Sequence, residues 1–192
     1  MKNDLQQIFV FIIELDKLKS VLRKTKPVGF DRYENSAEHS WQICMLAQAL
    51  APFAYKAIDI NRVIEILLVH DIPEIDTGDT IVYQDKLDSS EEIAAQRIFS
   101  LLPEPQASIY FSRWKEYEVR ESNEAVFAFA INRLMPVLHN LHNNGQSWKE
   151  NRVSLEKIIK VNSAIGHAIP TVWELIEGQI KIFAQNGGLV DH

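Results

Sequence analysis

Apolar residues recur along the chain at three- and four-residue spacing, which is typical of helices that pack through one face. The first such segment runs from about Asn3 to Val21, and its apolar face comprises Leu5, Ile8, Ile12, Leu15 and Leu18. No segment alternates apolar and polar residues in the manner of a strand. The pattern therefore predicts an all-α protein of roughly eight helices.

Capping residues predict where the second helix begins. Asn35 is a suitable N-cap, and Glu38, three residues later, completes a capping box in "ENSAEHSW". This places His39 in the first helical turn. The third helix should begin after Asp59 and end before Pro73, because proline disfavours helix in the residue before it.

Later helices are predicted from the same signals. A second capping-box pattern, Asp88–Glu91, predicts a helix that runs to about Leu102. The remaining segments with helical periodicity are 105–117, 124–144, with Ser122 or Asn123 as its cap, 152–165 and 170–185.

Length and composition predict one domain that spans residues 1–192. The chain is 46% hydrophobic, which suffices for one sizeable core. Its single cysteine, Cys44, excludes an internal disulfide and favours a reducing, cytoplasmic setting. The apolar string of residues 8–13 is too short for a membrane span, so we expect a buried helix there and no membrane anchor.

The formal charge of −6 argues against binding along a nucleic-acid backbone, which needs many Lys and Arg residues. A small phosphorylated ligand needs only a few local cations. The turn after the first helix offers Arg23 and Lys24, and Arg32 follows it. The planar fork of Arg suits phosphate oxygens, so the arginines are the better candidates, although each cation alone would also fit an ordinary solvated surface charge.

The dipeptide His70-Asp71 lies at the predicted end of the third helix. An imidazole nitrogen and a carboxylate oxygen there can both reach a cation, which the free carbonyls of a helix end also favour. The dipeptide alone is a weak signal, because a C-terminal His often serves only as a cap.

Two sequence segments strengthen the interpretation of His70-Asp71 as metal ligands. The first is "ENSAEHSW", which contains His39, and the second is "HDIPEIDTGD", which begins 31 residues later with His70. Together they resemble the HD-domain metal-dependent phosphohydrolases, and within them the small 5′-deoxynucleotidase-like branch. The resemblance covers about residues 15–139 and leaves the C-terminal helices, about 152–185, outside. It implies an HD-type helical domain, a homodimer and metal ligation by His39, His70, Asp71 and residue 132.

Residue 132 departs from the family pattern, which calls for Asp where this chain has Asn132. An amide oxygen can still coordinate a cation but brings no charge, so metal affinity should fall. Without the resemblance, Asn132 would be a polar helix residue packed against a neighbour. The ligand types favour Mn, Co, Fe, Ni or Zn over Ca, and Mg is also compatible.

Acidic residues follow Pro73 in what we expect to be a loop. The resemblance implies that Glu74 handles a proton and that Asp79 contacts substrate or water. Without it, both would be ordinary solvated loop acids, which is how we interpret Asp76. The family's Arg-Trp pair corresponds here to Arg23-Lys24, followed by Thr25, which weakens any case for deoxyribose selectivity.

The sequence thus predicts a metal-dependent hydrolase of phosphomonoesters, with a nucleoside 5′-monophosphate as substrate. One alternative is an impaired homologue that binds nucleotides or regulates without turnover, because of Asn132. A second alternative is an HD phosphodiesterase or nucleoside triphosphate hydrolase.

Other residues receive structural interpretations. Six apolar side chains in periodic helices are expected in the core or an interface: Trp41, Met45, Phe53, Met135, Trp148 and Trp173. Four histidines lack acidic or His partners at ligand spacing in the sequence: His139, His142, His167 and His192.

Overall fold

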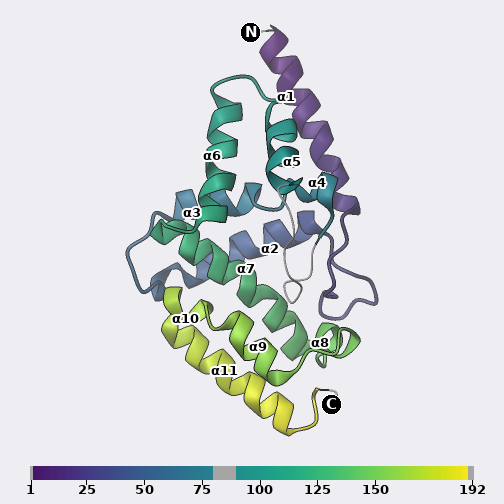
Figure 1. The fold of residues 1–192 in the computed structure, drawn as a ribbon, viewed down its shortest axis with the longest axis vertical. Coiled ribbons are helices and arrows are strands. Elements are labelled where there is room, and N and C mark those ends of the chain that lie inside the picture. Colours follow the sequence, from purple (N-terminus) through teal and green to yellow (C-terminus); the bar gives the residue numbers. More distant parts are fainter. Residues whose placement is uncertain (1, 80–89, 190–192) are drawn as a thin grey trace.

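The computed structural model describes residues 2–79 and 90–189, which form helices and no strand beyond one isolated antiparallel bridge between Leu22 and Asn35. Eight α-helices in this described part have eight or more residues, in agreement with the predicted all-α fold. Figure 1 shows the elements in order: α1 (Lys2–Glu14), the 3₁₀ helix η1 (Leu15–Ser20), α2 (Ser36–Leu50), η2 (Ala51–Phe53), α3 (Ile60–Val69), α4 (Glu74–Thr77), α5 (Ser90–Phe99), α6 (Gln106–Val119), α7 (Asn123–His142), α8 (Gln146–Glu150), α9 (Leu155–Asn162), α10 (Ile165–Ala168) and α11 (Pro170–Gln185).

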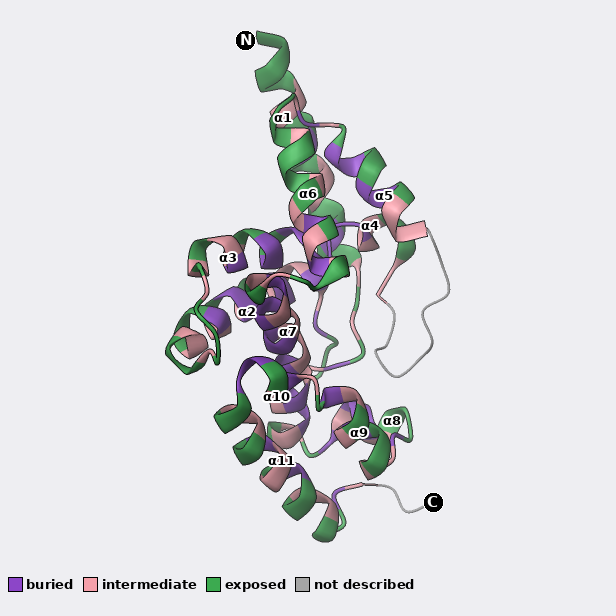
Figure 2. Cartoon of the chain, turned by 60° about the vertical axis from the view of Figure 1, so that its left-hand side comes forward, coloured by how far each residue is buried: buried purple, intermediate pink, exposed green. Residues whose placement is uncertain are grey.

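Helix α7 forms the centre of the molecule, with α2, α3, α6 and α10 packed around it. Its apolar side chains Phe127, Ile131 and Leu134 are almost fully buried, and much of α7 has the purple of buried residues in Figure 2. A second apolar cluster lies between α1, α5 and α6, around Phe99 and Trp114. Burial of this apolar surface supplies the main stabilisation of the fold.

The end of α3 lies where these two cores meet. Upstream residues of α3, including Leu67, belong to the core around α7, whereas Val69 and Ile72 belong to the second core. His70 and Asp71 are therefore held on both sides by buried apolar residues. Such flanking fixes the backbone that carries them.

The predicted caps are confirmed at three helices. Asn35 and Glu38 form a reciprocal capping box, in which the Glu38 N–H donates to Asn35 Oδ1 (3.0 Å) and the Asn35 N–H donates to Glu38 Oε1 (2.8 Å). Asp59 accepts from the N–H of Asn61 at 2.9 Å. At α7, it is Ser122 that provides the cap. The Asp88–Glu91 capping prediction rests partly on positions outside the described residues.

The N-terminal helix differs from the prediction in length and burial. It ends at Glu14 and continues as η1, and Phe11 is its one buried residue among those described. Phe9 and Ile13 are 63% and 68% exposed. The prediction of a buried helix is wrong for most of these side chains because α1 extends beyond the body of the molecule (Figure 1), and it packs against α5 and α6 mainly through Phe11.

Several other expectations need correction. Trp41, Met45 and Phe53 are exposed by half or more, so they are not core residues and an interface role for them stays a prediction, whereas Met135 and Trp148 are buried. Helix α8 was not predicted, and the segment predicted as one helix over 152–165 comprises α9 and the start of α10. No helix in the described part of the chain is long and apolar enough to span a bilayer.

Candidate metal centre

His39 is fixed in the first turn of α2, with its backbone N–H donating to the carbonyl of Asn35 at 3.0 Å. Its side chain is completely buried. Nδ1 of the ring faces the buried carboxylate of Glu34, 3.3 Å from Oε2. A carboxylate behind one ring nitrogen favours a proton on that nitrogen and leaves the other nitrogen, Nε2, to face the site.

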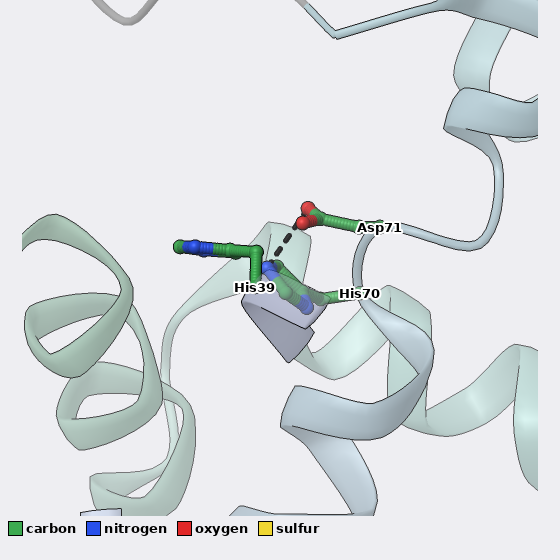
Figure 3. Close-up of side chains that lie close together, drawn as sticks. All are labelled: His39, His70 and Asp71. Atoms are coloured by element: carbon green, nitrogen blue, oxygen red, sulfur yellow. Dashed lines mark ion pairs between the residues drawn. The ribbon is translucent and has the colours of Figure 1, made fainter. Parts of the chain in front are cut away.

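His70 and Asp71 lie at the C-terminal end of α3, as predicted. Nδ1 of His70 lies 2.8 Å from the carbonyl oxygen of Leu67, a contact that requires a proton on Nδ1. Nε2 then carries a lone pair, although it lies 2.8 Å from Oδ1 of Asp71 (Figure 3). Nε2 is buried without a hydrogen-bond partner among the described residues. A lone pair beside a carboxylate oxygen is the arrangement that a cation stabilises.

The three predicted ligands converge in space. His39, His70 and Asp71 are all buried, and each offers a ligand atom within 4.8 Å of the others. Figure 3 shows the His39 ring beside the His70–Asp71 pair. Two imidazoles and one carboxylate are donors that suit a divalent transition metal. The donor set and the unpaired Nε2 of His70 therefore fit such an ion.

Asn132 completes the group from the middle of α7. Its Oδ1 lies 2.8 Å from Nε2 of His39, and its Nδ2 donates to Oη of Tyr117 at 2.6 Å. The structure thus brings residue 132 to the position that the resemblance implies, next to the His39 nitrogen that faces the site. Its role as a ligand stays a prediction.

Arg23 reaches the centre through a paired loop. The Arg23 N–H donates to the carbonyl of Glu34 (2.8 Å), and the Glu34 N–H donates to the carbonyl of Thr25 (2.9 Å). Nη1 of Arg23 then lies 3.1 Å from Oδ2 of Asp71 and 3.5 Å from Oδ1 of Asp79. Burial would lower the pKa of Arg23, but these carboxylates raise it above its ordinary value, so the guanidinium stays charged.

The Arg23 charge in turn affects the pKa of Asp71. Burial would raise the pKa of this carboxyl, but the positive charge of Arg23 helps to hold it well below its usual range. Asp71 is therefore an anion at neutral pH.

Glu74 and Asp79 behave differently from Asp71. Burial, together with the negative charge of Asp71, raises the pKa of Glu74 well above its usual value, and the pKa of Asp79 is raised for the same reasons. Ser36, at the first position of α2, donates its hydroxyl to Glu74 Oε2 at 2.7 Å. Glu74 opens the short helix α4 instead of lying in a loop, because Pro73 supplies a helical φ of −60° in front of it.

The remaining predicted charges lie elsewhere. Arg32 forms a two-pronged ion pair with Glu38 and is half-exposed, so its guanidinium is already occupied. Lys24 is exposed, and its charge only slightly opposes the raised pKa of Asp79. Asp76 was interpreted as a solvated loop charge, but it belongs to α4 and pairs with Arg97 at 2.6 Å.

Glu34 is the main residue that the sequence reasoning missed. Its completely buried carboxylate lies 3.2 Å from the hydroxyl of Thr25, 3.5 Å from Nε of Arg23 and 3.9 Å from Nδ1 of His139. Burial opposes its ionisation, but His39 and Arg23 lower its pKa below the ordinary value. Its position directly before the Asn35 cap, inside "ENSAEHSW", was a usable signal.

His139 also needs correction, because no acidic partner was expected for it. It lies two helical turns after Asn132 on α7, which turns it toward Glu34, and burial lowers its pKa. Tyr117 and Ser36 were missed as well, since neither carries a recognisable spacing signal.

Comparisons with known proteins agree with this architecture. A family model described as "HD domain" matches residues 15–173. A predicted metal-dependent phosphohydrolase from Magnetospirillum magnetotacticum is 40% identical, with a TM-score of 0.93 over 98% of this chain and 100% of that one.

More distant solved structures share the fold. A conserved hypothetical protein from Pyrococcus furiosus is 22% identical (TM-score 0.64, 88% of this chain and 99% of that one). An HD-domain phosphohydrolase from Listeria innocua is 18% identical (TM-score 0.57, 93% of this chain and 86% of that one). A comparison with curated proteins gave no significant match.

Proposed function

This chain belongs to the HD-domain family of metal-dependent phosphohydrolases, and we propose that it hydrolyses phosphomonoesters, with a nucleoside 5′-monophosphate as substrate. One observation carries the proposal: the ligand atoms of His39, His70 and Asp71 lie within 4.8 Å of one another beside a largely buried arginine. A cation and a guanidinium next to each other suit a dianionic phosphate.

The metal ligands in this proposal are His39, His70, Asp71 and the neutral Asn132. A divalent ion held there, of the transition series or Mg, would supply Lewis acidity toward a phosphoryl group. The donor set fits such an ion because Nε2 of His70 has no other partner among the described residues.

Arg23 would hold the phosphate in this reaction. Its Nη1 is anchored by Asp71 and Asp79, and a guanidinium has five N–H donors, so anchoring one edge leaves others for phosphate oxygens. The largely buried guanidinium would also help to exclude water from the bound phosphate.

Glu74 would deliver the proton that the departing alkoxide oxygen needs. Its raised pKa keeps it protonated at a higher pH than an ordinary carboxyl, and the Ser36 hydroxyl fixes one of its oxygens. Asp79 would contact the substrate or its water, close to Nη1 of Arg23. We propose no selectivity for deoxyribose, because Thr25 follows Lys24 where the family branch has its Arg-Trp pair in this turn.

A second candidate is a nucleotide-binding or regulatory homologue without turnover. The favouring observation is that Asn132, which has no charge, is already hydrogen-bonded to Tyr117 and lies against His39. A cyclic nucleotide or a nucleoside triphosphate is a further substrate class that an HD site can serve.

The test combines metal analysis with phosphate release. Purified protein would be analysed for bound metal and then assayed on a panel of nucleoside monophosphates, a cyclic nucleotide and a triphosphate, with Mn²⁺ or Co²⁺ added. Turnover of a monophosphate that is lost in His70→Ala supports the proposal. Activity that survives His70→Ala contradicts it, and metal binding and turnover that appear only in Asn132→Asp favour the second candidate.

A further inference from the structure

The segment 23–26 carries the arginine of the proposed phosphate site and forms a bend instead of a helix or a strand. Residue 34 satisfies part of its backbone, because the Arg23 N–H donates to the Glu34 carbonyl (2.8 Å) and the Glu34 N–H donates to the Thr25 carbonyl (2.9 Å). A bend has no hydrogen-bonded ladder of its own, so the other backbone groups of this segment need partners from elsewhere in the chain.

Gln146 supplies two of these partners with one side chain. Its Oε1 accepts from the Lys26 N–H at 2.9 Å, and its Nε2 donates to the Lys24 carbonyl at 3.3 Å. A backbone N–H can only donate and a backbone carbonyl can only accept, so these contacts fix which end of the amide is oxygen and which is nitrogen. Asn143 adds a third bond, from its Nδ2 to the Lys26 carbonyl at 3.3 Å. The Gln146 amide therefore bridges the backbone on both sides of Thr25.

Helix α8 holds Gln146 in place although it has only five residues. Trp148, two positions later, is 1% exposed, and its N–H donates to Oδ1 of Asn140 on α7 at 3.1 Å. Its ring packs against Phe183 of α11, with the ring centres 5.8 Å apart. Nε2 of Gln146 also donates to Glu150, one helical turn further, at 2.7 Å. The Gln146 side chain is thus oriented by its own helix as well as by the segment that it contacts.

The bridge bears on Arg23 because it holds the residue that follows Arg23. Glu34 fixes the N–H of Arg23 and Gln146 fixes the carbonyl of Lys24, so the Arg23 backbone is held on both flanks. The side chain that starts from this backbone is 12% exposed and reaches to 3.1 Å from Oδ2 of Asp71. A displacement of about 1 Å is enough to impair a group that binds or positions a substrate. The position of the guanidinium therefore depends on both partners of the segment.

We propose that Gln146 is a positioning residue for the substrate, which fixes the backbone of residues 24–26 and thereby aims the guanidinium of Arg23 at the phosphate. The inference rests on the proposed function and deepens it. It gives α8 a part in substrate binding, although none of its residues belongs to the candidate ligand set.

Gln146→Met tests the proposal, because Met keeps the unbranched shape of Gln and removes both hydrogen bonds to the segment. We expect KM for a nucleoside monophosphate to rise about fivefold, which is the size of effect that loss of a neutral hydrogen bond produces. Both kcat and the affinity for Mn²⁺ should change less than about twofold. An unchanged KM, or a loss of Mn²⁺ binding as large as the rise in KM, would overturn the inference.

A double-mutant cycle with Arg23→Lys shows whether Gln146 acts through Arg23. If it does, Gln146→Met should raise KM less than about twofold in the Arg23→Lys background, because the group that it positions is already lost. A fivefold rise in both backgrounds would mean that Gln146 acts independently of Arg23, which contradicts the proposal.

Gln48→Met is the matched control. Gln48 is an exposed residue of α2, and the same substitution there should leave KM unchanged. A rise in KM equal to that of Gln146→Met would contradict the assignment.

A second readout needs neither metal nor substrate. Hydrogen exchange measured by NMR follows the backbone N–H groups of Arg23 and Glu34, which bond within the loop and not to Gln146. We expect both to exchange about tenfold faster in Gln146→Met, since the segment is then held on one side only. Unchanged exchange would overturn the inference. If no variant hydrolyses a nucleotide while exchange does accelerate, the positioning of the segment stands and the proposed function fails instead.

Discussion

His70 and Asp71 reach the candidate metal centre from the end of one helix, whereas His39 and Asn132 lie 93 residues apart in sequence and reach it from two helices. We refer to the first pair as the charged half and to the second as the neutral half. The charged half contains the one carboxylate of the candidate ligand set and pairs with Arg23. The neutral half contains no carboxylate and is contacted by two supporting side chains, Glu34 and Tyr117.

This difference shows two ways to build half a site. Adjacent residues at a helix end are brought together by local backbone geometry, and the two flanking cores then hold the charged half in place. The neutral half forms only when α2, α6 and α7 pack together. Its geometry should therefore be more sensitive to substitutions that do not touch the ligands themselves.

The largest expected effect comes from removing the charge of the charged half. Asp71→Asn should weaken Mn²⁺ binding more than 100-fold, because ligand loss costs more than the 10- to 100-fold typical of supporting residues. Calorimetric titration would measure it beside His39→Ala, where we expect a smaller loss. Asp76→Asn, a nearby acid that pairs with Arg97, is the control and should bind normally. A larger loss in His39→Ala would reverse the ranking of the two halves.

A second substitution gives each half one carboxylate. Asn132→Asp adds a carboxylate to the neutral half and should tighten Mn²⁺ binding by roughly thirtyfold, about 2 kcal/mol, through added Coulomb attraction. The same titration checks this. Unchanged or weaker binding would mean that residue 132 does not contact the cation.

A third test concerns Arg23, the side chain that pairs with Asp71 of the charged half. Arg23→Lys keeps the charge but loses the planar fork, so KM for a nucleoside monophosphate should rise about tenfold. Steady-state kinetics would compare it with Arg32→Lys, whose side chain pairs with Glu38 and should leave KM unchanged. Equal effects of both substitutions would remove Arg23 from the substrate site.

The smallest expected effect concerns Glu74, whose pKa is raised in the folded protein. Because the folded state binds this proton more tightly than the unfolded state, the stability it provides is present at low pH and is lost as pH rises through the folded pKa. Each unit by which the folded pKa exceeds the unfolded pKa corresponds to about 1.4 kcal/mol of unfolding free energy.

Glu74→Gln should remove the loss of stability at high pH, because Gln does not ionise. Urea unfolding in EDTA should show the variant more stable than the native protein at pH 9 by roughly 1 kcal/mol, with little difference at pH 4. Glu156→Gln, at an exposed acid on α9, should show no such pH dependence. A variant that is less stable than the native protein at pH 9 would contradict the raised pKa.

The sequence predicted the charged half more completely than its surroundings. Asp59 and Pro73 delimited α3 closely enough to place His70 and Asp71 at its end, and the Asn35 capping box placed His39 in the first turn of α2. Asn132 was found through its resemblance to a family position and not through any local signal. Arg23 and Arg32 were equivalent candidates from the sequence, and only the pairing of the Arg23 and Glu34 backbones distinguished them.

The sequence by itself determined where α2, α3 and α7 begin, because caps act on neighbouring residues whatever the rest of the chain does. Tertiary structure alone decided which apolar faces are covered, as α1 and Trp41 show, because burial depends on whether a neighbour lies alongside. It also decided the contacts of Glu34 and Tyr117, since the direction of a buried hydrogen bond depends on residues that only packing brings together.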